Sequence, residues 1–277
     1  MKGRRGVVGA ALLGAIVVVS LAAPLLTGFG WEEQRLTEQY LPPGTAGHLL
    51  GTDVTGRDLF ARLLYGARLS LLVGFAATAV SVVIGVAYGA VSGYAGGRTD
   101  AVMMRVVDVL YSLPFLFLVI LVMTLFLGPG ASAGARIAVL LVVLGAVQWL
   151  TMARIVRGQV LTLKTREFVT AARSLGAGPA RILFRHIVPN LTDLIVVYAT
   201  LTVPRVMLQE AFLSFLGLGI PEPYPSWGRL AADGVRAITP VATHWWLVFF
   251  PSAAITVTLL ALNLLGETGN HFGRRRR

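Results

Sequence analysis

Long apolar segments are the feature of this sequence that most constrains its fold. A helix needs about 20 apolar residues to cross the hydrocarbon core of a bilayer, and six segments approach that length. Hydrophobic residues make up 56% of the chain and charged residues only 13%, whereas soluble domains are roughly 25% charged. We therefore predict an all-α membrane protein with six transmembrane helices. The predicted spans are Val7–Leu26, Leu69–Tyr94, Val109–Leu127, Ile137–Met152, Leu194–Leu216 and Trp245–Leu265.

Proline inside these segments does not exclude a span. Pro114, Pro204 and Pro251 each interrupt an apolar run, but neighbouring helices can satisfy the backbone groups that a proline frees. The first segment follows three basic residues and so also resembles a signal peptide. Its apolar run is longer than the usual 7–15 residues of a signal peptide, and five further spans follow, so we expect an uncleaved first helix.

The distribution of charge predicts how these spans are oriented. With the N-terminus in the cytoplasm, sixteen of the 24 Lys and Arg residues fall on the cytoplasmic side and seven on the outside. The outside segments also carry seven acidic residues, so their net charge is close to zero. This is the positive-inside pattern of membrane proteins. It predicts that both termini are cytoplasmic, and it explains the net charge of +11 without nucleic acid binding.

The chain divides into three predicted parts. Residues 1–68 hold the first span and an extracytoplasmic loop. Residues 69–266 form the core, in which a polar cytoplasmic loop covers residues 154–189. Residues 267–277 form a basic C-terminal tail.

The polar loop contains the signals of two short helices. Thr165 is a candidate N-cap, and Glu167 lies in the first turn, where the helix dipole favours an acid. Gly176 ends the first helix, because glycine adopts the left-handed conformation without penalty. Pro179 suits the first turn of a second helix, which runs to Ile187. Pro189 ends or kinks that helix before the next span begins.

The first short helix carries small and apolar residues on one face. Phe168, Ala171, Ala172 and Leu175 lie at helical spacing, with basic residues on either side. Such a face fits a groove on another protein, and it equally fits the surface of an anionic bilayer. The residues alone leave both interpretations open.

Four motifs together resemble one family of membrane proteins. Residues 170–176 (Thr-Ala-Ala-Arg-Ser-Leu-Gly) and 186–190 (His-Ile-Val-Pro-Asn) resemble the EAA loop of ABC-importer permeases. Residues 51–70, which include Gly-Thr-Asp-Val-Thr-Gly-Arg-Asp, resemble the start of the C-type permease of oligopeptide, dipeptide and nickel importers. Residues 210–228 and the Asn-Leu-Leu-Gly of residues 263–266 are similar to later parts of the same subunit. The resemblance covers essentially the whole chain.

This resemblance implies the type I importer permease fold and a role in transport in a prokaryotic inner membrane. Such permeases pair with a second homologous permease, two ATP-binding subunits and an extracytoplasmic substrate-binding protein. The resemblance favours an oligopeptide or dipeptide as cargo, although nickel and glutathione-type importers share these motifs, and no cofactor is implied. The loop helix would act as a rigid lever against an ATP-binding subunit. The resemblance places the coupling contacts at Glu167, Thr170, Ala171, Ala172, Arg173, Gly176, His186 and Pro189.

The chain departs from the family pattern at two places. Thr170 stands where the EAA loop usually has Glu, which would weaken any contact that this Glu makes. The usual tail after the last span is replaced by a short sequence that ends in four arginines. That replacement affects C-terminal contacts and not the pathway.

Two ionisable residues lie inside the fifth predicted span. Arg205 is near its middle and Glu210 is nearer its outer end. An ion inside the membrane is costly and usually faces a pathway or a partner charge. Both are therefore candidates for the pathway or for gating. The alternative for Arg205 is packing against a partner subunit or an acid elsewhere in the bundle, and for Glu210 it is a structural role in the bundle.

Two other classes of function were weighed against an importer subunit. A stand-alone secondary transporter predicts an internal repeat and ionisable residues at the midplane, and no convincing repeat is present. A membrane enzyme needs convergent acids, histidines or nucleophiles, but the four histidines are dispersed and the chain has no cysteine. The phosphate-binding Gly-x-x-x-x-Gly-Lys-Ser/Thr loop is also absent, so ATP hydrolysis is expected on separate subunits.

Overall fold

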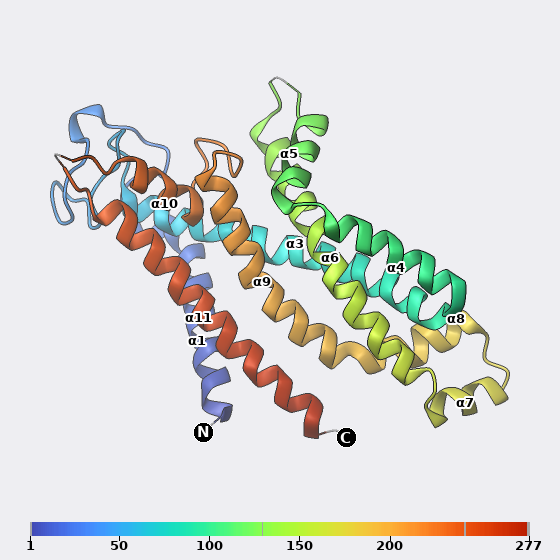
Figure 1. Cartoon of the computed structure of the whole chain (residues 1–277). Helices are drawn as coiled ribbons and strands as arrows, with labels where there is room; N and C mark the ends of the chain where they lie inside the picture. The colour runs from blue at the N-terminus through green and yellow to red at the C-terminus, as the bar shows by residue number, and fades with distance from the viewer. Residues whose placement is uncertain (1, 129, 241, 276–277) are drawn as a thin grey trace.

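The structure is a computed structural model that describes residues 2–128, 130–240 and 242–275, with side chains from Arg5 to Gly266 apart from the two gaps. Within these ranges the regular elements are helices, and no strand occurs (Figure 1). The long helices are α1 (Lys2–Leu21), α3 (Leu59–Ala95), α6 (Ala133–Leu163), α9 (Thr192–Phe215) and α11 (Trp246–Arg275).

Four helical segments of the described chain are long and apolar enough to cross a membrane. They are Leu59–Ala95, Ala133–Leu163, Pro179–Phe215 and Trp246–Gly266. The apolar part of α1, Arg5–Leu21, is shorter, and a turn at Ala22 separates it from α2 (Ala23–Leu26). The all-α membrane fold is confirmed, and the sixth span stays a prediction.

The third predicted span is wrong as a single straight helix. The chain forms α4 (Gly97–Ser112) and α5 (Phe115–Phe126), which are bent by 91° and make a fifth span only if both halves belong to it. The residue before a proline is driven out of the helical region, and Leu113 is accordingly extended with ψ 132°. Pro114 therefore breaks the helix here, whereas Pro204 and Pro251 lie inside continuous helices.

Two helices extend beyond the charged residues that mark the ends of the predicted spans. α3 begins ten residues before the predicted span and includes Arg62 and Arg68. Arg68 donates to the backbone carbonyls of Ser20 (2.7 Å) and Leu21 (2.9 Å) and so satisfies the end of α1. α6 continues to Leu163, inside the loop predicted for residues 154–189. The division of the chain at residue 68 consequently falls within α3.

Glycines bring α3 and α6 close together. A Cβ at Gly89 would lie 2.3 Å from the carbonyl oxygen of Ala153. Gly85 and Gly93 on α3, and Gly145 on α6, leave equally little room. Small residues at this spacing let helix backbones approach in a membrane, and α3 is thereby the central support of the fold.

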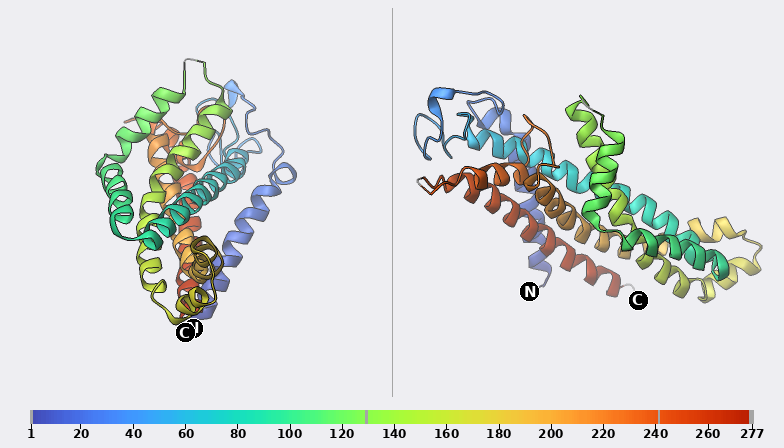
Figure 2. Two further views of the ribbon diagram at one scale, coloured as in Figure 1. Left: turned by 90° about the vertical axis from the view of Figure 1, so that its right-hand side faces the viewer. Right: turned by 45° about the horizontal axis from the view of Figure 1, so that its top comes forward.

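The short elements gather at the two ends of the molecule. The termini lie at the same end as α7 (Glu167–Ser174) and α8 (Pro179–Arg181), whereas the loop after α2 and α10 (Trp227–Arg236) lie at the other end (Figures 1 and 2). Both termini therefore share a side with the basic loop, as the charge pattern predicted. The side chains of the predicted tail, residues 267–277, lie outside the described residues.

The extracytoplasmic loop is held by buried ion pairs. Asp53 accepts from Arg57 Nε (2.8 Å) and also pairs with Arg62. Asp58 caps α3 by accepting from the backbone N–H of Ala61 (2.6 Å), and its second oxygen lies 2.8 Å from His48 Nδ1. The motif at residues 51–58 thus fixes the start of α3.

Candidate coupling and pathway sites

The first site is built on α7, which projects from the cytoplasmic end of α6 (Figure 1). Its predicted N-cap is wrong, because Thr165 turns back to the carbonyl of Thr162 (3.0 Å) and Arg166 occupies the cap position without a side-chain bond. Glu167 lies in the first turn, as predicted. Gly176 ends the helix with φ +80°, and two bonds, Gly176 N–H to Arg173 and Ala177 N–H to Ala172, close a Schellman motif.

The two sides of α7 have different partners. Val169 and Ala172 are buried in a core with Ile182, Leu183 and Ile187, and this core anchors the helix to its own chain. Phe168 and Leu175 are 38% and 88% exposed. Ala172 was predicted among the coupling contacts, but its side chain is only 9% exposed and faces this core. The remaining α7 positions predicted for coupling are exposed: Glu167, Thr170, Ala171, Arg173 and Gly176.

The segment after α7 changes helix type rather than ending. Pro179 occupies the first turn of α8, as predicted, and the chain continues as a π-helix, η2 (Ile182–Ile187), and a 3-10 turn, η3 (Val188–Leu191). Pro189 lacks the N–H that an α-helix needs, and the wider π turn lies directly before it. The side chain of His186 is half-buried and its carbonyl accepts from Asn190 (2.6 Å), while Pro189 is exposed.

One exposed residue of this segment escaped the sequence analysis. Phe184 on η2 is 58% exposed. A large aromatic residue in a loop that is otherwise polar was the signal in the sequence that could have pointed to it.

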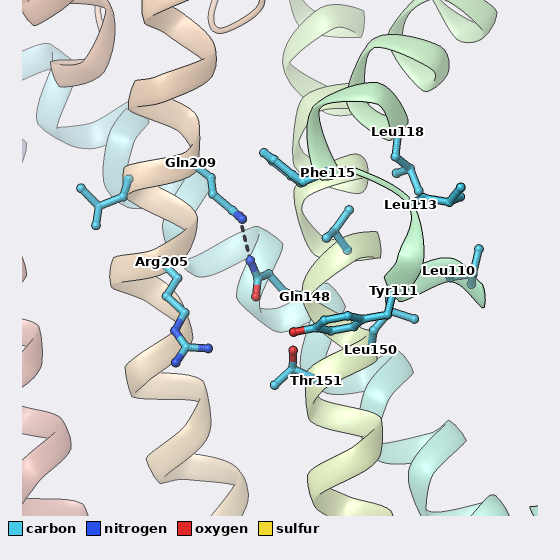
Figure 3. A pocket seen from close by; sticks show the side chains of 12 residues that line it. Leu110, Tyr111, Leu113, Phe115, Leu118, Gln148, Leu150, Thr151, Arg205 and Gln209 are labelled. Carbon is cyan, nitrogen blue, oxygen red and sulfur yellow. Dashed lines mark hydrogen bonds between the residues drawn. The ribbon is translucent and has the colours of Figure 1, made fainter. Parts of the chain in front are cut away.

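The second site is a cavity of about 480 Å³ between α6 and α9, closed on one side by the bend between α4 and α5 (Figure 3). Leu110, Leu113, Phe115 and Leu118 supply an apolar wall. The polar groups of its lining come mainly from α6 and α9: Tyr111, Gln148, Thr151, Arg205 and Gln209.

Polar side chains on facing helices form the middle of this cavity. Gln148 Nε2 of α6 donates to Gln209 Oε1 of α9 over 2.7 Å (Figure 3). Arg205 lies one turn before Gln209 on the same face of α9, and its side chain is exposed. The sequence analysis identified Arg205 but missed both glutamines. Two amide side chains inside predicted spans were the signal, because polar groups in a membrane face partners or water.

Glu210 is not part of this cavity. It is 2% exposed and accepts from the hydroxyls of Ser214 (2.7 Å) and Ser226 (2.8 Å). Ser226 caps α10, and Gly228 allows α10 to approach Ala211 closely, since a Cβ there would lie 2.4 Å from its Cα. The structure thus separates the two ionisable residues of the fifth span, and Glu210 joins α9 to α10.

Comparisons with known proteins agree with the motif analysis. Residues 81–276 match the model of the family described as binding-protein-dependent transport system inner membrane component. The chain is 46% identical over 266 residues to the dipeptide transport system permease protein DppC of Bacillus subtilis, covering 96% of this chain and 80% of the relative. It is 44% identical over 270 residues to the oligopeptide transport system permease protein OppC of Escherichia coli K12, covering 96% and 85%.

A third relative, the OppC protein of Bacillus subtilis, is 42% identical over 260 residues, covering 94% of this chain and 82% of that protein. None of these similarities supports a stand-alone secondary transporter or a membrane enzyme. One assignment follows from the helical membrane fold, the basic loop with α7 and the family match. The chain belongs to the family of binding-protein-dependent transport system inner membrane components, as a multi-pass permease subunit of an ABC importer.

Proposed function

We propose that this chain forms half of the translocation pathway of an ATP-driven importer for oligopeptides or dipeptides. The relatives are named for dipeptide and oligopeptide transport and cover most of the chain. The partners are a second homologous permease, two ATP-binding subunits and an extracytoplasmic binding protein. In this assignment the ATP-binding subunits move the cytoplasmic segment that contains α7 when ATP closes them together, and the cavity between α6 and α9 belongs to the pathway.

The observation that carries the coupling role is the exposed apolar face of α7. Phe168, Ala171 and Leu175 lie on one side of a helix whose other side is anchored by Val169 and Ala172. A helix fixed to its own chain transmits a push as a rigid body, as a switch between two packed states requires. Its free face is the part available to an ATP-binding subunit. Glu167, Thr170 and Arg173 form the polar surroundings of that face, and Gly176 ends the helix beside it. His186 and Pro189 belong to the segment that joins α7 to α9.

The test replaces one exposed leucine at each end of the molecule. Leu175→Glu places a charge on the free face of α7, and Leu49→Glu makes the same change at a 60% exposed position in the extracytoplasmic loop. The importer is purified through a tag on this chain, and its ATP-dependent uptake of a tripeptide is measured in liposomes. Leu175→Glu is expected to retain the second permease and lose the ATP-binding subunits, with uptake reduced at least about tenfold.

Leu49→Glu should behave like the wild type in both measurements. Ala171→Arg should repeat the result of Leu175→Glu, whereas Ala172→Arg should lower the yield of folded protein, because Ala172 is buried. If Leu175→Glu keeps both the ATP-binding subunits and uptake, α7 is not the coupling element. Its apolar face would then rest on the bilayer.

A further inference from the structure

Arg205 is a cation without an ion-pair or hydrogen-bond partner among the described residues. It belongs to the span Pro179–Phe215 and lines the cavity between α6 and α9. Within the described residues, no carboxylate forms an ion pair with its guanidinium and no hydrogen bond satisfies it. An isolated charge inside a membrane is costly. The site is therefore built for water together with an anion that comes from elsewhere.

The groups around Arg205 match the polar ends and backbone of a peptide. Gln148 donates one hydrogen bond from its amide nitrogen to the amide oxygen of Gln209. The amide oxygen of Gln148 and the amide nitrogen of Gln209 therefore remain available to a ligand. A second cavity of about 30 Å³ adjoins the first toward α7 and shares Gln148, Thr151 and Arg205 with it. Polar groups thus continue along the groove between α6 and α9, while its opposite wall is apolar.

We propose that Arg205, flanked by Gln148 and Gln209, binds the C-terminal carboxylate of the peptide inside the pathway. A guanidinium has five donors in a planar arrangement that suits a carboxylate. The terminal carboxylate is the one anion that every unmodified peptide carries, so a single site serves cargoes of different sequence. Leu110 and Phe115 then face the variable side chains without specific contacts. This inference rests on the proposed function, because it requires peptide in this cavity.

The experiment uses the absence of cysteine from the chain. The importer carrying Arg205→Cys is treated with methanethiosulfonates that attach an ammonium, a neutral methyl or a sulfonate group. Uptake of one tripeptide is compared with uptake of its C-terminal amide, each with saturating binding protein and each relative to the wild type. Wild-type importer given the same reagents reports any reaction on other subunits.

A carboxylate site predicts that Arg205→Cys slows uptake of the free acid about tenfold and uptake of the amide less than twofold. The ammonium reagent should restore uptake of the acid, and the neutral and sulfonate reagents should not. Equal losses for acid and amide would overturn the proposal, as would loss of the second permease during purification, which would assign Arg205 to a partner acid. If the wild type takes up neither peptide with ATP, the proposed function itself has failed.

Discussion

Asp53 forms ion pairs with two buried arginines, Arg57 and Arg62, at the extracytoplasmic end. Burial raises the pKa of its carboxyl, but the charges of Arg62 and Arg57 and the hydrogen bond from Arg57 outweigh burial and lower the pKa below its usual value. The carboxylate therefore stabilises the fold above the unfolded pKa of about 3.9. This stabilisation is lost as the pH falls through the lowered folded value.

Asp53→Asn is expected to destabilise the protein by about 3 kcal/mol at pH 7, because it removes the carboxylate that pairs with two buried guanidinium groups. The thermal midpoint, followed by tryptophan fluorescence in detergent, should drop at pH 7. The difference from the wild type should shrink below about pH 4. Asp193→Asn, at an exposed acid on α9, is the matched control and should change little. A difference that does not depend on pH would show that the carboxylate charge is not responsible.

For single residues, the sequence alone predicts the roles that depend only on the local backbone conformation. Gly176 and Pro179 were placed correctly, because a left-handed C′ position and a helix first turn depend only on neighbouring residues. Thr165 was wrongly predicted as an N-cap, and the burial of Ala172 within its own chain was not predicted. The hydroxyl of Thr165 bonds instead to the backbone carbonyl of Thr162, one turn earlier. The side of α7 that is buried depends on its packing against η2, and the spacing of residues within α7 does not reveal that packing.

The crossing of α3 and α6 is the element contact that tolerates least change. Gly89→Ala would place a methyl group 2.3 Å from the backbone oxygen of Ala153, and a backbone atom cannot move away without separating the helices. We expect a loss of about 1–3 kcal/mol, measured as a lower thermal midpoint. Gly158→Ala on α6 is the control, because no atom lies within 4 Å of its added Cβ. It should be neutral or slightly stabilising, because alanine favours a helix over glycine.

If Gly89→Ala is as stable as Gly158→Ala, the two helices do not depend on this close contact.

The spacing of Gly85, Gly89 and Gly93 was visible in the sequence, and it is typical of helix contacts in membranes. Element boundaries were harder to predict, because an apolar run marks the part of a helix in lipid and not the whole helix. The three interior prolines illustrate a second limit. Pro114, Pro204 and Pro251 give the same local signal in the sequence, but only Pro114 lies at a break between helices.

For the whole molecule, the number of crossings follows from where the ends of the helices lie. The termini and α7 share one end, so the chain must cross the membrane an even number of times. Four described helices are long and apolar enough to cross, and the count becomes six if α1 crosses and α4 and α5 together cross once. The N-terminal end of α6 then lies outside, at the same face as the extracytoplasmic loop.

Single cysteines in this cysteine-free chain can decide the path of α4 and α5. Leu49→Cys marks the outside and Leu175→Cys the inside, and Gly134→Cys tests the start of α6, where an added Cβ meets no atom within 4 Å. A membrane-impermeant maleimide applied to intact spheroplasts should label positions 49 and 134. Position 175 should react only after permeabilisation. Labelling of position 134 only after permeabilisation would mean that α4 and α5 return to the cytoplasmic side, which would place α7 outside and remove its access to any ATP-binding subunit.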